Sequence, residues 1–196
     1  MYPALPHRLN SAITAVPRSH QWTALSVIEW RSADMAKATD QLIDLFASQL
    51  SAAGVPIRRE DNTSRLKELE AKLPRRLLLT FASLLSRYSF ASFNAGGITF
   101  FGWGAVHTEF AGIARPAKGS LSELLLPSGY IQVGRPDTGD SDAVCFDLNV
   151  PKQNREYRIV QANHEEILCN SRVKIRTELW PSFRKLAEQQ ILVKQK

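Results

Sequence analysis

The chain has 196 residues and a formal net charge of +6 at pH 7, with 44% hydrophobic and 22% charged residues. This length corresponds to one ordinary domain, or to one domain with a short appendage. The composition excludes a wholly disordered or collagen-like chain. No stretch approaches the ~18 consecutive apolar residues of a membrane-spanning helix, so we predict no membrane span.

The N-terminal residues 1–31 are predicted to be an arm that is partly loose, because prolines and polar residues dominate its first part. The arm has no charged region followed by an apolar one, so it does not resemble a secretory signal. Residues 22–30 (WTALSVIEW) form a short apolar stretch, interpreted as a strand or as a cap on the core. The two cysteines, Cys145 and Cys169, form no CxxC pair, and we predict reduced thiols in a cytoplasmic protein.

Three helices are predicted in the first half of the chain. Residues 33–53 have apolar side chains at helical spacing, with Ser32 as the N-cap and Gly54 as the stop. Residues 64–72 form a short helix. Residues 75–88, after Pro74, carry the clearest apolar stripe of the chain: Leu77, Leu78, Phe81, Leu84, Leu85 and Tyr88.

The second half of the chain has the pattern of short strands joined by turns. A turn at 94–97 precedes a strand at 98–101, and further strands are predicted at 130–133, 143–148 and 157–161, with another proposed at 164–169. One or two helical turns are predicted at 120–126, and a final helix at 181–192. Strands at hairpin spacing after a helical part predict an α+β domain over residues 32–192, with helices packed on a mainly antiparallel sheet.

The sequence contains no recognised catalytic, metal or cofactor motif. There is no GxSxG, no HExxH, no paired CxxC and no phosphate-binding glycine loop. We therefore predict a protein with no catalytic residues, no metal and no cofactor. A hydrolase that uses Asp140 or Asp142 with His164 remains a third hypothesis, and it requires the histidine to lie within hydrogen-bonding reach of a carboxylate.

Four residues are candidates for binding a partner. Asp137, Asp140 and Asp142, followed by Asp147, form the densest polar cluster of the chain. For this cluster a hairpin turn, an ion or acid–base site, and an acidic spot for a basic partner all stay open. Trp103 lies between Gly102 and Gly104, and it is an interface anchor if exposed but a core residue if buried.

The basic residues are dispersed, which favours a solvated rim. Arg172, Lys174 and Arg176 nevertheless alternate, so in an extended segment they would share one face. They are candidate anion-binding residues, and a module that binds nucleic acid or an anionic surface is the alternative function.

Two segments together resemble the SUKH superfamily, which contains the yeast cell-wall-synthesis regulator and many bacterial immunity proteins. The first is residues 69–79 (LEAKLPRRLLL), which run into the amphipathic helix. The second begins with a strand at 130–133, a Gly139-Asp140 turn and the strand end Phe146-Asp147. It continues with a strand that contains Ile159-Val160, with His164-Glu165, and with a helix that begins near residues 180–183 (WPSF).

The resemblance covers about residues 60–190 and implies a compact SUKH-like α+β domain. It also implies a binding protein without enzymatic activity, and the bacterial members are antidotes that bind and block a cognate toxin. A toxin domain is therefore a candidate partner. The positive net charge works against a basic nuclease as the target and leaves acidic or neutral partners open.

Overall fold

The structure is a computed structural model that describes residues 23–105, 109–113, 120–150 and 156–193, and for residues 23–33, 111, 113 and 193 the backbone alone. The chain divides into two compact units, residues 1–35 and residues 36–196. In the first unit the described residues belong to helix α1 (Thr23–Ala52). Residues 23–30 are thus helical, and the expectation of a strand there is wrong. Residues 1–22 of the predicted arm lie outside the described part.

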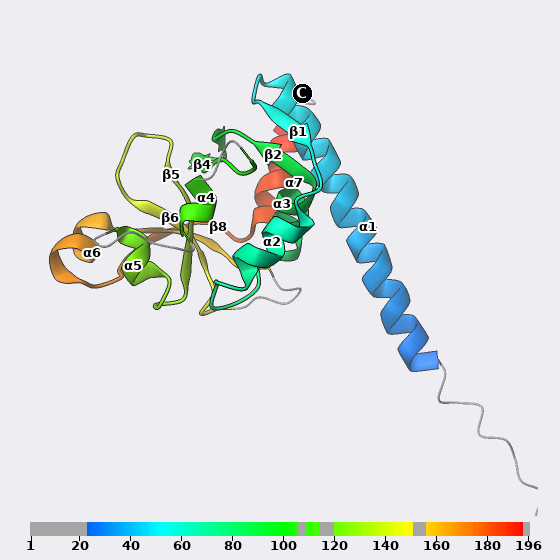
Figure 1. Cartoon of the computed structure of the whole chain (residues 1–196), viewed down its shortest axis with the longest axis horizontal. Helices are drawn as coiled ribbons and strands as arrows, with labels where there is room; N and C mark the ends of the chain where they lie inside the picture. Colours follow the sequence, from blue (N-terminus) through cyan, green and yellow to red (C-terminus); the bar gives the residue numbers. More distant parts are fainter. Residues whose placement is uncertain (1–22, 106–108, 114–119, 151–155, 194–196) are drawn as a thin grey trace, which may run out of the picture. The chain divides into compact units, whose positions relative to one another are not determined.

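The second unit is built on an antiparallel sheet whose strands follow one another in sequence order (Figure 1). This confirms the predicted α+β class. Each strand pairs with the next along the chain. Short turns connect β3 to β4 and β5 to β6, whereas the connection from β4 to β5 contains two helices and the one from β7 to β8 contains another. The six strands of the sheet are β3 (Phe93–Ala95), β4 (Ile98–Phe100), β5 (Tyr130–Pro136), β6 (Ala143–Asp147), β7 (Ile159–Ala162) and β8 (Ile175–Trp180). A separate pair is formed by β1 (Ile57–Arg59) and β2 (Tyr88–Phe90).

Both faces of the sheet are covered in its middle strands, and β6 shows this most clearly because all five of its residues are buried. Val144 and Phe146 join the larger core, which also contains residues of α1, α2 (Thr63–Glu70), α3 (Leu79–Arg87) and α7 (Phe183–Val193). Ala143 and Cys145 join a smaller core beneath α5 (Leu121–Leu125) and α6 (His164–Asn170). The alternation of side chains along a strand therefore separates two helical layers. A short α4 (Glu109–Ile113) precedes the second layer in the chain.

The helices agree with the sequence prediction in their buried faces more than in their ends. All six residues of the stripe in 75–88 are buried, although α3 begins only at Leu79 and Pro74 lies before it. Helix α1 begins before Ser32, so this serine is not the N-cap. Among the apolar residues whose spacing predicts this helix, Phe46 and Leu50 are buried, whereas Met35 and Leu45 are exposed. The buried face also includes Thr39, Ile43 and Ala47.

One predicted strand is a helix. Residues 164–169 lie in α6, because Asn163 caps that helix by accepting a hydrogen bond from the Glu166 backbone N–H at 3.2 Å. Glu165 and Glu166 in the first turn add a favourable interaction with the helix dipole. Among the described residues, no helix has the length and apolarity needed to cross a bilayer.

Candidate functional site

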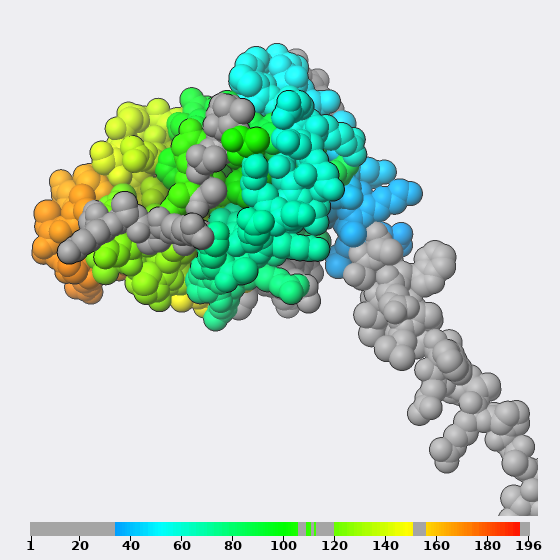
Figure 2. All heavy atoms as spheres, in the orientation of Figure 1, coloured from blue at the N-terminus to red at the C-terminus, as the bar shows by residue number. Residues whose placement is uncertain are grey.

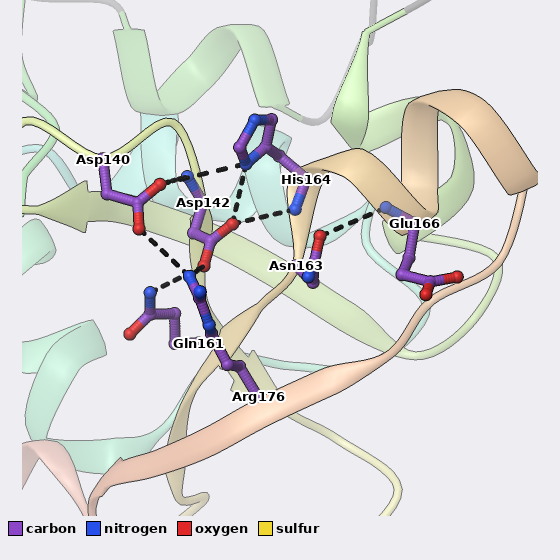
Figure 3. Close-up of polar contacts among 7 residues, drawn as sticks. All are labelled: Asp140, Asp142, Gln161, Asn163, His164, Glu166 and Arg176. Atoms are coloured by element: carbon purple, nitrogen blue, oxygen red, sulfur yellow. Dashed lines mark hydrogen bonds and ion pairs between the residues drawn. The ribbon is translucent and has the colours of Figure 1, made fainter.

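A polar cluster of five residues lies where the β5–β6 hairpin, β7 and α6 meet (Figure 3). Asp140 and Asp142 come from the hairpin turn that leads into β6, and His164 is the first residue of α6. Gln161 lies on β7 and Arg176 on β8. Because β6, β7 and β8 are neighbours in the sheet, their pairing brings together side chains that are 19 to 36 residues apart in the sequence.

The carboxylate of Asp142 is the centre of this cluster. One oxygen, Oδ1, accepts from the His164 backbone N–H at 2.9 Å and lies 2.8 Å from His164 Nδ1. The other, Oδ2, accepts from Gln161 Nε2 at 2.7 Å and from Arg176 Nη1 at 2.8 Å. The side chain is only 1% exposed, so four donors replace the water that burial removes.

These contacts keep Asp142 ionised. Burial by itself raises the pKa of the carboxyl, but the hydrogen bonds from His164, Gln161 and Arg176 outweigh it and lower the pKa from 3.8 to about 2. An ionised carboxylate can only accept, so the proton on the imidazole is assigned to Nδ1. The Nε2 atom then lies on the side of the ring away from both aspartates (Figure 3).

Asp140, Asp142 and His164 are the one group of potential metal ligands found among the described residues, with their ligand atoms within 4.8 Å of one another. Arg176 already supplies a cation there, because its Nη1 lies 3.2 Å from Asp140 Oδ2 and 2.8 Å from Asp142 Oδ2. The guanidinium contacts the Oδ2 atoms, so it already balances charge on both carboxylates. The arrangement therefore fits an internal ion-pair network better than a metal centre.

An open hollow of about 340 Å³ lies next to the cluster, and His164 belongs to both. The hollow is lined by Ser120, Leu121, Ser122, Gln132, Arg135, Ser141, His164 and Leu168. The second helical layer forms much of its wall, and α5 and α6 lie side by side on the surface of the unit (Figure 2). The hollow could not be predicted from the sequence, because the described lining residues come from separate parts of the chain that share no motif.

Two lining residues stand out by their exposure. Leu168 keeps 57% of its surface exposed on α6, beside the hollow. Arg135 is exposed on β5, and within the part of the chain that the structure describes no carboxylate pairs with it. Ser122 and Gln132 are buried, and the Ser122 hydroxyl donates a hydrogen bond to Gln132 Oε1 at 3.3 Å. These two polar side chains therefore already have a hydrogen-bond partner.

The structure corrects two of the candidate partner-binding residues. Trp103 is fully buried and donates its indole N–H to the Leu85 carbonyl at 2.7 Å, so it belongs to the core. Asp142 is also buried and fully engaged by its donors, and it cannot meet a partner directly. Asp137 is exposed and Asp140 is partly exposed, so both keep surface that a partner could reach.

The basic residues Arg172, Lys174 and Arg176 do not form one free face. Of the three, only Arg176 lies in β8, which begins at Ile175. Lys174 Nζ lies 3.6 Å from Glu166 Oε1, and Arg176 pairs with Asp140 and Asp142. Two of the three positive charges are therefore balanced by local carboxylates, which weakens the case for an anion site there.

Comparison with known proteins gives no assignment: no family model matches the chain, and neither does any curated protein.

Proposed function

We propose that this chain is a non-enzymatic protein-interaction domain, resembling SUKH proteins, and that it binds its partner through the hollow between α5 and α6. The observation that carries the proposal is the exposed Leu168 at a hollow whose neighbouring polar cluster is satisfied internally. Exposed apolar side chains in a concave site commonly mark an interface. The resemblance adds an immunity role against a toxin domain as the specific form of this proposal.

A cytoplasmic location is part of the proposal. Both cysteines are free, Cys145 buried and Cys169 exposed. An exposed free thiol fits a reducing compartment better than an oxidising one.

Site-specific photo-crosslinking tests the proposed function. A photoreactive amino acid at Leu168 should give a discrete protein adduct in native lysate, and its mass identifies the partner. The matched control places the same group at Leu192, which is 63% exposed on α7. If the two positions give the same adducts, or if Leu168 gives none at several salt concentrations, the proposed interface is wrong.

The His164–Asp142 pair supports a second candidate function, hydrolysis. The 2.8 Å contact fulfils the distance requirement for this hypothesis, and a neutral imidazole oriented by Asp142 could take a proton from water at Nε2. Ester and phosphoester substrates test it directly. Turnover that disappears in His164→Gln would favour the enzyme, whereas no turnover above buffer at pH 7–8 removes it.

A further inference from the structure

The donor and acceptor groups around the hollow define the chemistry of what it can hold. Arg135 offers five N–H donors and no acceptor. The amide of Gln132 is already used, because its oxygen accepts from Ser122 and its Nε2 donates to the Gly134 carbonyl at 3.4 Å. The hydroxyl of Ser120 is buried and has no partner in the structure. The Arg135 guanidinium can only donate, whereas the Ser120 hydroxyl can donate or accept, so the hollow suits a ligand that offers acceptors to Arg135.

The charges around the hollow favour a negative ligand. None of the described residues that line the hollow is acidic. Asp140 and Asp142 contact the Nδ1 side of His164 and are paired with Arg176. Among the described lining residues Arg135 is therefore the unpaired cationic side chain, and an exposed guanidinium binds carboxylates in a two-pronged geometry.

The apolar part of the lining completes the recognition surface. Leu121 on α5 and Leu168 on α6 both belong to the wall, and Leu168 is largely exposed. A volume of about 340 Å³ is at the lower end of the range for ligand pockets. It has room for a few side chains but not for a folded domain.

From these observations we propose that the hollow takes an acidic segment of the partner protein, in which one carboxylate pairs with Arg135 and an adjacent apolar side chain packs on Leu168. This inference rests on the proposed function, since it names the chemistry of the partner at the same surface. The chain's net charge of +6 agrees with an acidic partner.

Peptide titration followed by the amide NMR signals of the ¹⁵N-labelled protein tests this. The probes are acetyl-Leu-Glu-Leu-amide and its uncharged match acetyl-Leu-Gln-Leu-amide. We expect the Glu peptide to shift signals of Arg135, His164 and Leu168, with a dissociation constant on the order of millimolar. The Gln peptide should bind about tenfold more weakly, as expected for losing a charged hydrogen bond.

Variants locate the two contacts. Arg135→Gln should remove the preference for the Glu peptide, whereas Arg172→Gln, which removes another exposed charge outside the hollow, should leave it unchanged. Leu168→Ala should weaken both peptides to a similar degree, and Leu192→Ala should weaken neither. All four substitutions lie on the surface, so the amide spectrum verifies that the fold is kept.

Several results would overturn the inference: equal binding of the two peptides, equal effects of the two arginine variants, or no shifts up to ~10 mM peptide. The crosslinking result separates this failure from that of the proposed function. If Leu168 captures a discrete partner but the peptides fail, the interface stands and the acidic-segment chemistry is wrong. If the peptides bind as expected but no partner is captured, the proposed function is wrong and the hollow is left as a site for an acidic peptide.

Discussion

At the scale of single residues, buried carboxylates are the most informative feature of this protein. Asp142 and Glu156 are both buried, yet their pKa values move in opposite directions. Asp142 has donors on both oxygens, whereas Glu156 Oε2 has no partner in the structure. The number of donors therefore decides whether burial favours the charged or the neutral form.

We expect Asp142→Asn to destabilise the protein by roughly 2–4 kcal/mol. The new amide NH₂ would face Gln161 and Arg176, which are both donors. The change is measured as a shift of the urea unfolding midpoint. The matched control, Asp137→Asn on the same hairpin, is exposed and should change stability by less than about 0.5 kcal/mol. Equal effects would show that the network around Asp142 contributes little.

Asp142→Asn should also alter how the free energy of unfolding depends on pH in the acidic range. The folded-state pKa of Asp142 is about 2, below its ordinary value of 3.8. Its ionisation therefore contributes about 2 kcal/mol above pH ~4, and this contribution is lost as the pH falls through 2. The stability difference between the wild type and Asp142→Asn should shrink over that window. A difference that stays constant from pH 6 to pH 2 would contradict the assignment.

The pKa of Glu156 is shifted in the other direction, so we expect the opposite dependence of stability on pH. Burial raises its pKa, although hydrogen bonds from Thr80 Oγ1 at 2.5 Å and the Thr80 N–H act against the rise. The stability associated with the neutral form is complete below pH ~4.5 and is lost as the pH rises through the raised pKa. Glu156→Gln keeps an acceptor for Thr80, so it should gain stability relative to the wild type as the pH rises. Thermal unfolding of both proteins from pH 4 to pH 8 measures this. The prediction is wrong if Glu156→Gln loses stability relative to the wild type as the pH rises.

At the scale of elements, the turns and close strand contacts determine the sheet. Gly96 and Gly97 both have positive φ, 59° and 80°, in the β3–β4 turn, as the turn signal at residues 94–97 predicts. Gly134 serves a different purpose: it lies at the irregularity in the β5–β6 pairing, with its backbone against β4. Its missing side chain allows the close approach of two strands.

We expect Gly134→Ala to destabilise the protein by roughly 1–3 kcal/mol, because the added Cβ would collide with the Thr99 carbonyl oxygen. Gly112→Ala on α4 is the control, since its Cβ would meet nothing within 4 Å, and it should be neutral or slightly stabilising. Denaturant unfolding compares the two. A Gly134→Ala variant as stable as the wild type would mean that β4 and β5 are not packed this closely.

At the scale of the whole molecule, the net charge of +6 is spread over a surface on which many charges are paired locally. We therefore expect retention on heparin to be weak, with elution below roughly 0.3 M salt. The double variants Arg172→Gln/Lys174→Gln and Arg58→Gln/Arg59→Gln remove the same charge from different sites and should lower the elution point equally. A much larger effect of the first pair would instead favour the nucleic-acid or anionic-surface function.

The sequence alone determined the parts of this protein that depend on local order. Side chains at helical spacing predicted the buried face of α3, the glycines predicted the β3–β4 turn, and the Asp-rich segment at 137–142 lies in the β5–β6 connection. The α+β class was predicted from the change along the chain, from apolar residues at helical spacing to short strands joined by turns. Residues 163–166 (NHEE) also carried a helix-start signal that was missed, because Asn followed by Glu three positions later is typical of a capped N-terminus.

Only the tertiary structure decided which residues meet. It placed Trp103 in the core, and it brought His164 to Asp142 through the pairing of β6 with β7. It also formed the hollow from residues of β5, α5 and α6 that share no pattern. The physical reason is that spacing along a chain records which face of one element is apolar, whereas the partner of that face depends on strand order and long-range packing.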